Sequence, residues 1–230
     1  MKTEAKIWDS DFFGIKIASV TVGKSDTTDT IDRELIRLKQ QKYRMVYLFS
    51  PVQLNPGNIG KWLLADRKRS YIMDSPQPRQ PHNDVAAFSS DPHQLHSLAI
   101  TAGAYSRFAK DPHILPEDFQ RLYITWIDNS VNKGFADYVF TARDGKETHA
   151  ALITATRRDD VLSIGLLATH QDHRHHGLAR MLVERMEQEA YSLGIPLEVT
   201  TQTDNTAACA FYTACNFNSF TDTFVYHIWM

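Results

Sequence analysis

Apolar and polar positions along the chain repeat with two periods, one typical of amphipathic helices and the other of strands. The helical spacing predicts helices over residues 29–41, 57–65, 91–102, 116–130, 178–193 and 206–215. Short apolar and β-branched runs predict strands over residues 15–22, 45–49, 137–142, 149–157, 161–167 and 197–201. Turns are expected at 143–146 and 157–160, and the prolines of residues 74–83 predict a solvated loop. The pattern indicates an α/β protein.

Composition narrows the class without naming a function. Of the 230 residues 43% are hydrophobic and 23% are charged, as in ordinary globular proteins. The net charge is −2 and the chain has no long basic run, which argues against a nucleic acid as partner. Neither a signal-peptide core nor an apolar run of about 18 residues is present, so no membrane association and a cytoplasmic location are expected.

A phosphate-binding loop is predicted between the strand at 161–167 and the helix that follows it. The loop reads Arg174-His175-His176-Gly177-Leu178-Ala179, with Arg180 next. The first turn of a helix carries unpaired N–H groups and the positive end of the helix dipole, so it attracts phosphate. Small residues at 177 and 179 let an anion approach the backbone, and Arg174 adds a positive charge. The alternative is a helix start in which Gly177 only permits close packing.

The loop and the residues after it resemble the GNAT acetyltransferases. The loop matches their motif Arg/Gln-x-x-Gly-x-Gly/Ala, and a predicted strand, Asn205 and the pair Phe211-Tyr212 follow in the family's order. The resemblance implies a mixed, mostly antiparallel sheet flanked by helices, and acetyl-CoA as co-substrate. The implied cofactor-binding residues are Leu167, Ala168, Arg174, His175, His176, Gly177, Leu178, Ala179, Arg180 and Asn205.

The same resemblance implies roles in catalysis. Main-chain groups of Leu167 and Ala168 would meet the pantetheine and the thioester, and Asn205 would hydrogen-bond the pantetheine. Tyr212 would be the acid that protonates the departing thiolate. Ordinary structural roles stay open, namely a helix N-cap for Asn205 and core packing for Tyr212.

Further segments are similar to the sugar-nucleotide branch of the GNAT superfamily. They are residues 8–14, 103–112, 122–130 and 225–229. This likeness implies an acceptor amine on a dTDP-linked 4-amino-4,6-dideoxy sugar, with Arg107 binding the diphosphate. A surface salt bridge is the alternative for Arg107. Another amine (a peptide N-terminus, lysine or antibiotic) and a non-catalytic acyl-CoA-binding module are the alternative functions.

We therefore expect two domains, an N-terminal α/β domain on the substrate side over residues 1–92 and the GNAT domain over residues 93–230. A homodimer is allowed but not required. The general base is not identified by the pattern, although His170 is the first candidate. We predict no metal site, because the four histidines of residues 170–176 lack a second ligand group with recognisable spacing.

Overall fold

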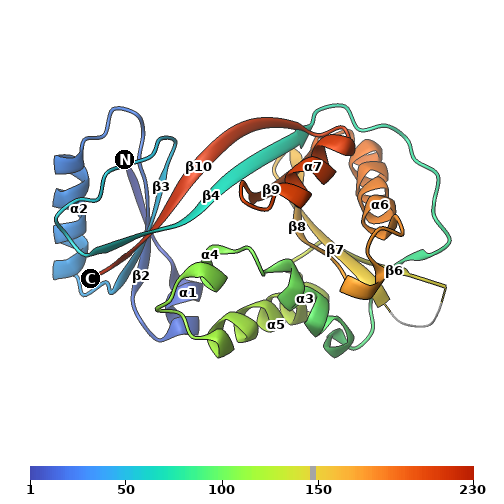
Figure 1. Ribbon diagram of the computed structural model, residues 1–230, viewed down its shortest axis with the longest axis horizontal. Helices are drawn as coiled ribbons and strands as arrows, with labels where there is room; N and C mark the ends of the chain where they lie inside the picture. The colour runs from blue at the N-terminus through green and yellow to red at the C-terminus, as the bar shows by residue number, and fades with distance from the viewer. Residues whose placement is uncertain (146–148) are drawn as a thin grey trace.

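The computed structural model describes residues 1–145 and 149–230, which form one long mixed sheet flanked by helices (Figure 1). The ten strands follow the order β1-β2-β3-β10-β4-β9-β8-β7-β6-β5. Among the strands of the described residues, only the pairs β2–β3 and β8–β9 are parallel. The sheet is therefore mostly antiparallel, as expected from the resemblance.

The strands are β1 (Lys2–Ala5), β2 (Ile17–Thr21), β3 (Met45–Ser50), β4 (Lys61–Met73), β5 (Val85–Ala87), β6 (Tyr138–Arg143), β7 (His149–Arg158), β8 (Val161–Thr169), β9 (Leu197–Gln202) and β10 (Asn218–Trp229). The α-helices are α1 (Ile7–Phe13), α2 (Thr28–Gln40), α3 (His96–Ala102), α4 (Arg107–Lys110), α5 (Pro116–Asn132), α6 (Leu178–Leu193) and α7 (Thr206–Ala214). Short 3-10 helices are η1 (Pro92–Leu95) and η2 (Gln171–His173). Most predicted elements are confirmed within a few residues.

The predicted helix over 57–65 is wrong. Gly60 has a φ of 77°, and β4 begins at the next residue. A Cβ at position 60 would lie 2.7 Å from Cγ2 of Ile228, so β10 packs directly against this backbone. β4 pairs with β10 along almost its whole length and with β9 at its far end. These tertiary pairings outweigh the local helical spacing.

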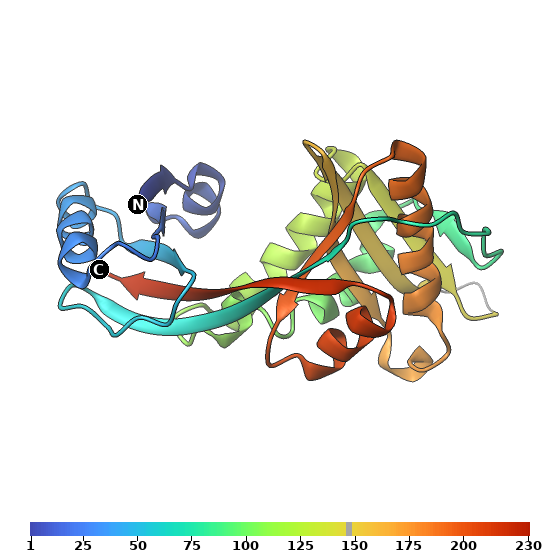
Figure 2. The same ribbon diagram turned by 90° about the horizontal axis from the view of Figure 1, so that it is seen from above.

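The molecule has an N-terminal lobe around β1–β3 and α2 and a second lobe around β5–β9, α6 and α7. The two long strands β4 and β10 join these lobes as a twisted ribbon (Figure 2). One end of β10 pairs with β3, in the lobe that α2 covers. The first part of β4 and the last part of β10 thus belong to the N-terminal lobe. The division at residues 92 and 93 stays a prediction, and β10 runs across it.

Three hydrophobic clusters fill the layers between helices and sheet. One packs α6 and α7 on β6–β9, and another packs α2 on β2, β3 and β10. The third lies under α3, α4 and α5 and reaches both lobes, since it joins Tyr47 of β3 to Leu152 of β7. None of the described helices is long and apolar enough to span a membrane.

One of the two predicted turns is confirmed, and the other lies partly outside the described residues. Asp159 and Asp160 form the turn between β7 and β8, as predicted. Asp144 and Gly145 lie in a bend after β6, whereas Lys146, the last residue of the other predicted turn, lies outside the described residues.

Candidate active site

The strands β8 and β9 begin as neighbours and then separate. Their parallel pairing covers only Leu162–Ile164 against Leu197–Val199. Beyond it each strand continues, β8 to Thr169 and β9 to Gln202, without pairing to the other. A wedge-shaped gap with free main-chain groups on both sides therefore opens toward the loop before α6.

A β-bulge in β8 sets which main-chain groups point into this gap. Gly165 and Leu166 lie opposite the single residue Thr154 of β7, and Thr154 Oγ1 accepts a hydrogen bond from Leu166 N at 2.9 Å. Farther along, His170 N donates to Ala150 O at 2.8 Å. The alternation of an antiparallel ladder then points the main chain of Ala168 toward β7 and that of Leu167 into the gap.

The loop before α6 leads into a helix start whose first backbone N–H groups have no side-chain cap. Gly177 is the N-cap with a φ of 81°, and no side chain caps the helix. Its carbonyl accepts the first helical bond from Met181 N, so the N–H groups of residues 178–180 have no intrahelical partner. The geometry fits an anion at this helix start.

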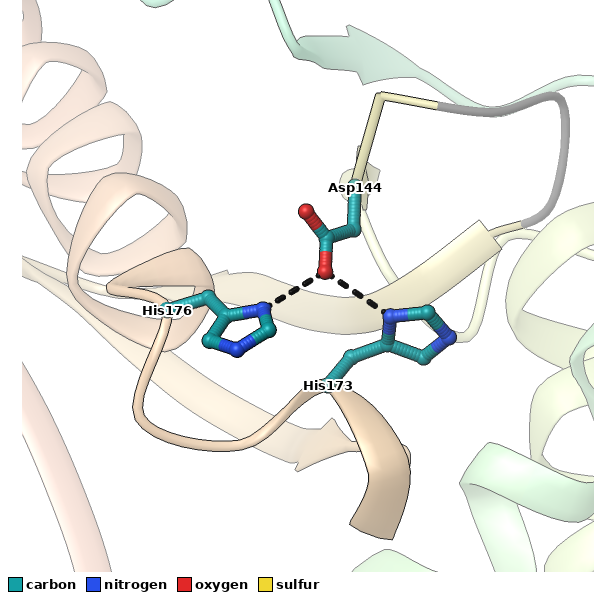
Figure 3. A group of neighbouring side chains, drawn as sticks. All are labelled: Asp144, His173 and His176. Atoms are coloured by element: carbon teal, nitrogen blue, oxygen red, sulfur yellow. Dashed lines mark hydrogen bonds and ion pairs between the residues drawn. The ribbon is translucent and has the colours of Figure 1, made fainter.

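Side chains on both flanks hold this loop in place. His173 Nδ1 and His176 Nδ1 lie 2.8 and 2.7 Å from the same Asp144 oxygen (Figure 3). Hydrogen bonds from the two histidines hold the pKa of Asp144 below its usual range. Arg180 donates to Ala214 O at the end of α7 at 3.0 Å, and Arg174 Nε donates to Thr169 O at 3.5 Å.

A cavity of about 670 Å³ lies under the ribbon, where the gap meets the helices α4 and α5. Four of the predicted site residues line it together, namely Arg107, Leu167, Asn205 and Tyr212. Residues 174–180 and Ala168 are not part of its lining. Cofactor-side and acceptor-side candidates from distant parts of the sequence thus share one space.

Tyr212 packs in the core and also faces the cavity. Its ring centroid lies 5.9 Å from that of Tyr71 and 5.7 Å from that of Phe217. Burial raises the pKa of its hydroxyl, which stays protonated at neutral pH. Both roles weighed from the sequence are compatible with this position.

Asn205 is the N-cap of α7, and its Oδ1 accepts from Ala208 N at 3.2 Å. This confirms the structural role. The capping bond leaves the two N–H groups of the side-chain amide as donors, and the residue lines the cavity. Asp204, the residue before Asn205, forms an ion pair with Lys110 of α4, with 2.6 Å between Lys110 Nζ and Asp204 Oδ2.

Arg107 is held as a stacked cation beside the cavity rather than in a surface salt bridge. Its Cζ lies 3.8 Å from the ring centroid of Tyr47 and 4.5 Å from that of Phe108. Its Nη1 is buried and has no hydrogen-bond partner within the described chain. Burial lowers the pKa of Arg107. A buried, unpaired guanidinium nitrogen at a cavity wall is a strong site for an anionic group.

Among the ionisable cavity residues that the sequence analysis did not name are Asp66 and Lys68. Asp66 and Lys68 point from β4 to the same side, two residues apart. Burial raises the pKa of Asp66, whose Oδ1 is buried without a partner among the described residues. Burial and the nearby Arg107 lower the pKa of Lys68 to about 8. The wrong helix prediction over 57–65 concealed the strand that carries both.

His170 does not belong to this group. It caps η2, where its Nδ1 accepts from Asp172 N at 3.4 Å, and it is not part of the cavity lining. The structure thus gives no support to His170 as the base.

Comparisons with known proteins place this geometry in a family. The model of the acetyltransferase (GNAT) family matches residues 102–217. A protein assigned to the GNAT family from Novosphingobium aromaticivorans aligns with 81% of this chain and 74% of its own, at 16% identity and a TM-score of 0.59. A GCN5-related N-acetyltransferase from Kribbella flavida aligns with 93% of this chain and 81% of its own, at 14% identity and a TM-score of 0.54.

A conserved protein of unknown function from Staphylococcus epidermidis has the same fold, with a TM-score of 0.60 at 9% identity over 93% of this chain and 83% of its own. No curated protein sequence matches this chain. The family match covers half of the chain and contains α6, its N-terminal loop, the gap between β8 and β9, and α7. The chain therefore belongs to the GNAT family and is an N-acetyltransferase.

Proposed function

We propose that this N-acetyltransferase transfers the acetyl group of acetyl-CoA to the amine of a nucleotide-linked amino-deoxysugar, as TDP-fucosamine acetyltransferase does. The observation that carries the proposal is the shared cavity, whose lining includes Tyr212 and Leu167 together with Arg107 and Lys68. The first pair suits a thioester, and the second pair suits the diphosphate of a nucleotide sugar.

On the cofactor side, the pyrophosphate of acetyl-CoA would lie on the N–H groups of residues 178–180, beside Arg174. The pantetheine would enter the gap between β8 and β9 and bond to the main chain of Leu167, with the Asn205 amide as a further donor. The facing edges of β8 and β9, which do not pair with each other beyond Ile164 and Val199, and the start of α6 without a side-chain cap support this placement.

In the reaction, the neutral amine would attack the thioester carbon and form a C–N bond, and the C–S bond would then break. The Leu167 N–H would donate to the oxygen that becomes negative during attack. Asp66 would accept the amine proton, and the Tyr212 hydroxyl would donate to the departing sulfur. The pKa shift of Asp66 supports this assignment, because a carboxylate with a raised pKa is a better base.

On the acceptor side, the cavity offers both charge and aromatic surface. Arg107, Lys68 and Arg158 line it as cations. Trp8 and Phe135, with ring centroids 6.4 Å apart, add partly exposed rings to its lining. Cations suit a diphosphate, and rings suit a base or a sugar face.

Charge at position 177 should control the binding of acetyl-CoA. Because Gly177 has a φ of 81°, any side chain strains the loop, but asparagine tolerates this conformation best. We expect Gly177→Asp to bind acetyl-CoA more than roughly tenfold more weakly than Gly177→Asn, since only the aspartate repels the pyrophosphate. Isothermal titration calorimetry on both folded variants makes the comparison. Affinities within about twofold of each other would contradict the phosphate loop.

Removing the guanidinium of Arg107 should weaken the binding of the nucleotide sugar but not that of acetyl-CoA. We expect Arg107→Met to raise the KM for a dTDP-amino sugar roughly tenfold to a hundredfold, the effect of one lost charge-assisted contact. The affinity for acetyl-CoA should stay unchanged. Assays of thiol release with dTDP- and UDP-amino sugars and with the matching free amino sugars measure both effects.

The free amino sugar should be a poor acceptor for the unaltered protein, since it lacks the diphosphate that orients the amine. Equal rates with the free sugar and its dTDP conjugate would contradict the nucleotide-sugar proposal. Preferred acetylation of a peptide or an antibiotic would favour the other acceptor classes.

A further inference from the structure

The cluster of Asp144, His173 and His176 combines residues that the sequence separates. Asp144 follows β6, whereas both histidines belong to the loop between β8 and α6. Their candidate ligand atoms lie within 4.8 Å of one another. The carboxylate is the second ligand group that the histidine-rich loop lacks when its sequence is considered alone.

The local backbone directs all three side chains to one point. His173 ends η2, and His175, which lies between the two cluster histidines, has a φ of 66°, so the chain turns sharply between them. Figure 3 shows the Nδ1 atoms of both rings directed at the same Asp144 oxygen. A positive φ costs free energy in a residue other than glycine, and at His175 it brings the next residue, His176, into the cluster.

We propose that Asp144, His173 and His176 bind a divalent transition metal of the zinc class. Two imidazole nitrogens and one carboxylate oxygen are a known set of three protein ligands for zinc. In such sites water occupies the fourth position. Ligand atoms around tetrahedral zinc lie about 3.3 Å apart, so the N–O distances of 2.7 and 2.8 Å need to lengthen only slightly.

The exposure of the cluster permits both this adjustment and metal exchange. The side chains of His173 and Asp144 are each 32% exposed, and that of His176 is 53% exposed. His176 directly precedes Gly177, the N-cap of α6, so a bound metal would brace the phosphate loop. The site is separate from the acceptor cavity and does not depend on the proposed acceptor.

The test uses the full chain without a polyhistidine tag, stripped with a chelator and titrated with Zn²⁺ by calorimetry. We expect one equivalent to bind, and Asp144→Asn and His176→Gln each to weaken binding by at least roughly tenfold. His175→Asn is the matched control, because this histidine lies between the two ligands and is not in the cluster; it should keep the affinity for Zn²⁺.

Cobalt provides a second measurement. Titration with Co²⁺ should give the strong visible absorption of a four-coordinate ion, and Asp144→Asn should abolish it. Circular dichroism verifies that each variant is folded. Absence of Zn²⁺ binding, or an affinity that Asp144→Asn and His176→Gln leave unchanged, would show that the cluster is only a hydrogen-bonded clamp and would overturn the proposal. A failure of the acceptor assays would not affect this result.

Discussion

Tyr212→Phe is expected to lower turnover about a hundredfold, the lower end of the effect of a positioned acid. The ring packs against Tyr71 and Phe217, and phenylalanine preserves these contacts. Only the hydroxyl is lost. Acetyl-CoA affinity and melting temperature should stay close to those of the unaltered protein, and single-turnover assays of thiol release measure the chemical step.

Tyr71→Phe is the matched control for this change. Tyr71 is a neighbouring buried phenol that is not part of the cavity lining. Its variant should keep full turnover. Equal turnover of Tyr212→Phe and the unaltered protein, with chemistry rate-limiting, would leave Tyr212 as a core residue only.

Asp66→Asn should lower the rate at neutral pH by roughly a hundredfold or more, since the reacting amine loses the group that accepts its proton. The deficit should narrow as the pH rises, because hydroxide then increasingly replaces Asp66 as acceptor of the proton that the neutral amine releases on attack. In the unaltered protein the rate should fall as the pH falls through the raised pKa of Asp66. Rates for both proteins across the pH range give the comparison.

Glu198→Gln distinguishes the base from a general effect of lost charge. Glu198 is a second carboxylate that lines the cavity, on β9 instead of β4. If Asp66 is the base, the rate deficit of Glu198→Gln should be small. A deficit in Asp66→Asn that stays constant at every pH would indicate structural damage instead of a lost base.

The parts of the site that depend on local backbone could be predicted from the sequence. The loop of residues 174–180 and the cap at Asn205 follow from helix starts, which have strong residue preferences. The family motif then linked them to Tyr212, and the structure brings Tyr212 and Asn205 to one cavity. Arg107 also lines that cavity, although the sequence left a surface salt bridge equally open.

The parts that depend on pairing between distant strands could not be predicted. Asp66 and Lys68 line the cavity because β4 pairs with β9 and β10, and these partners are distant in the sequence. The helical spacing over 57–65 pointed elsewhere, because local periodicity does not contain the sheet partners. For the same reason the contact of Asp144 with His173 and His176 could not be predicted, since Asp144 lies 29 and 32 residues before them.

The place of β10 in the sheet governs the order in which the protein can fold during synthesis. β10 lies between β3 and β4, yet its residues 218–229 leave the ribosome long after both of those strands. Until then β3 has an unpaired edge formed by the apolar residues 45–49, and the N-terminal lobe cannot be completed. Pairing between strands that are distant in the sequence slows folding and leaves aggregation-prone strand edges exposed. The apolar edge of β3 is therefore left without its β10 partner in the nascent chain until the last strand of the sheet is made.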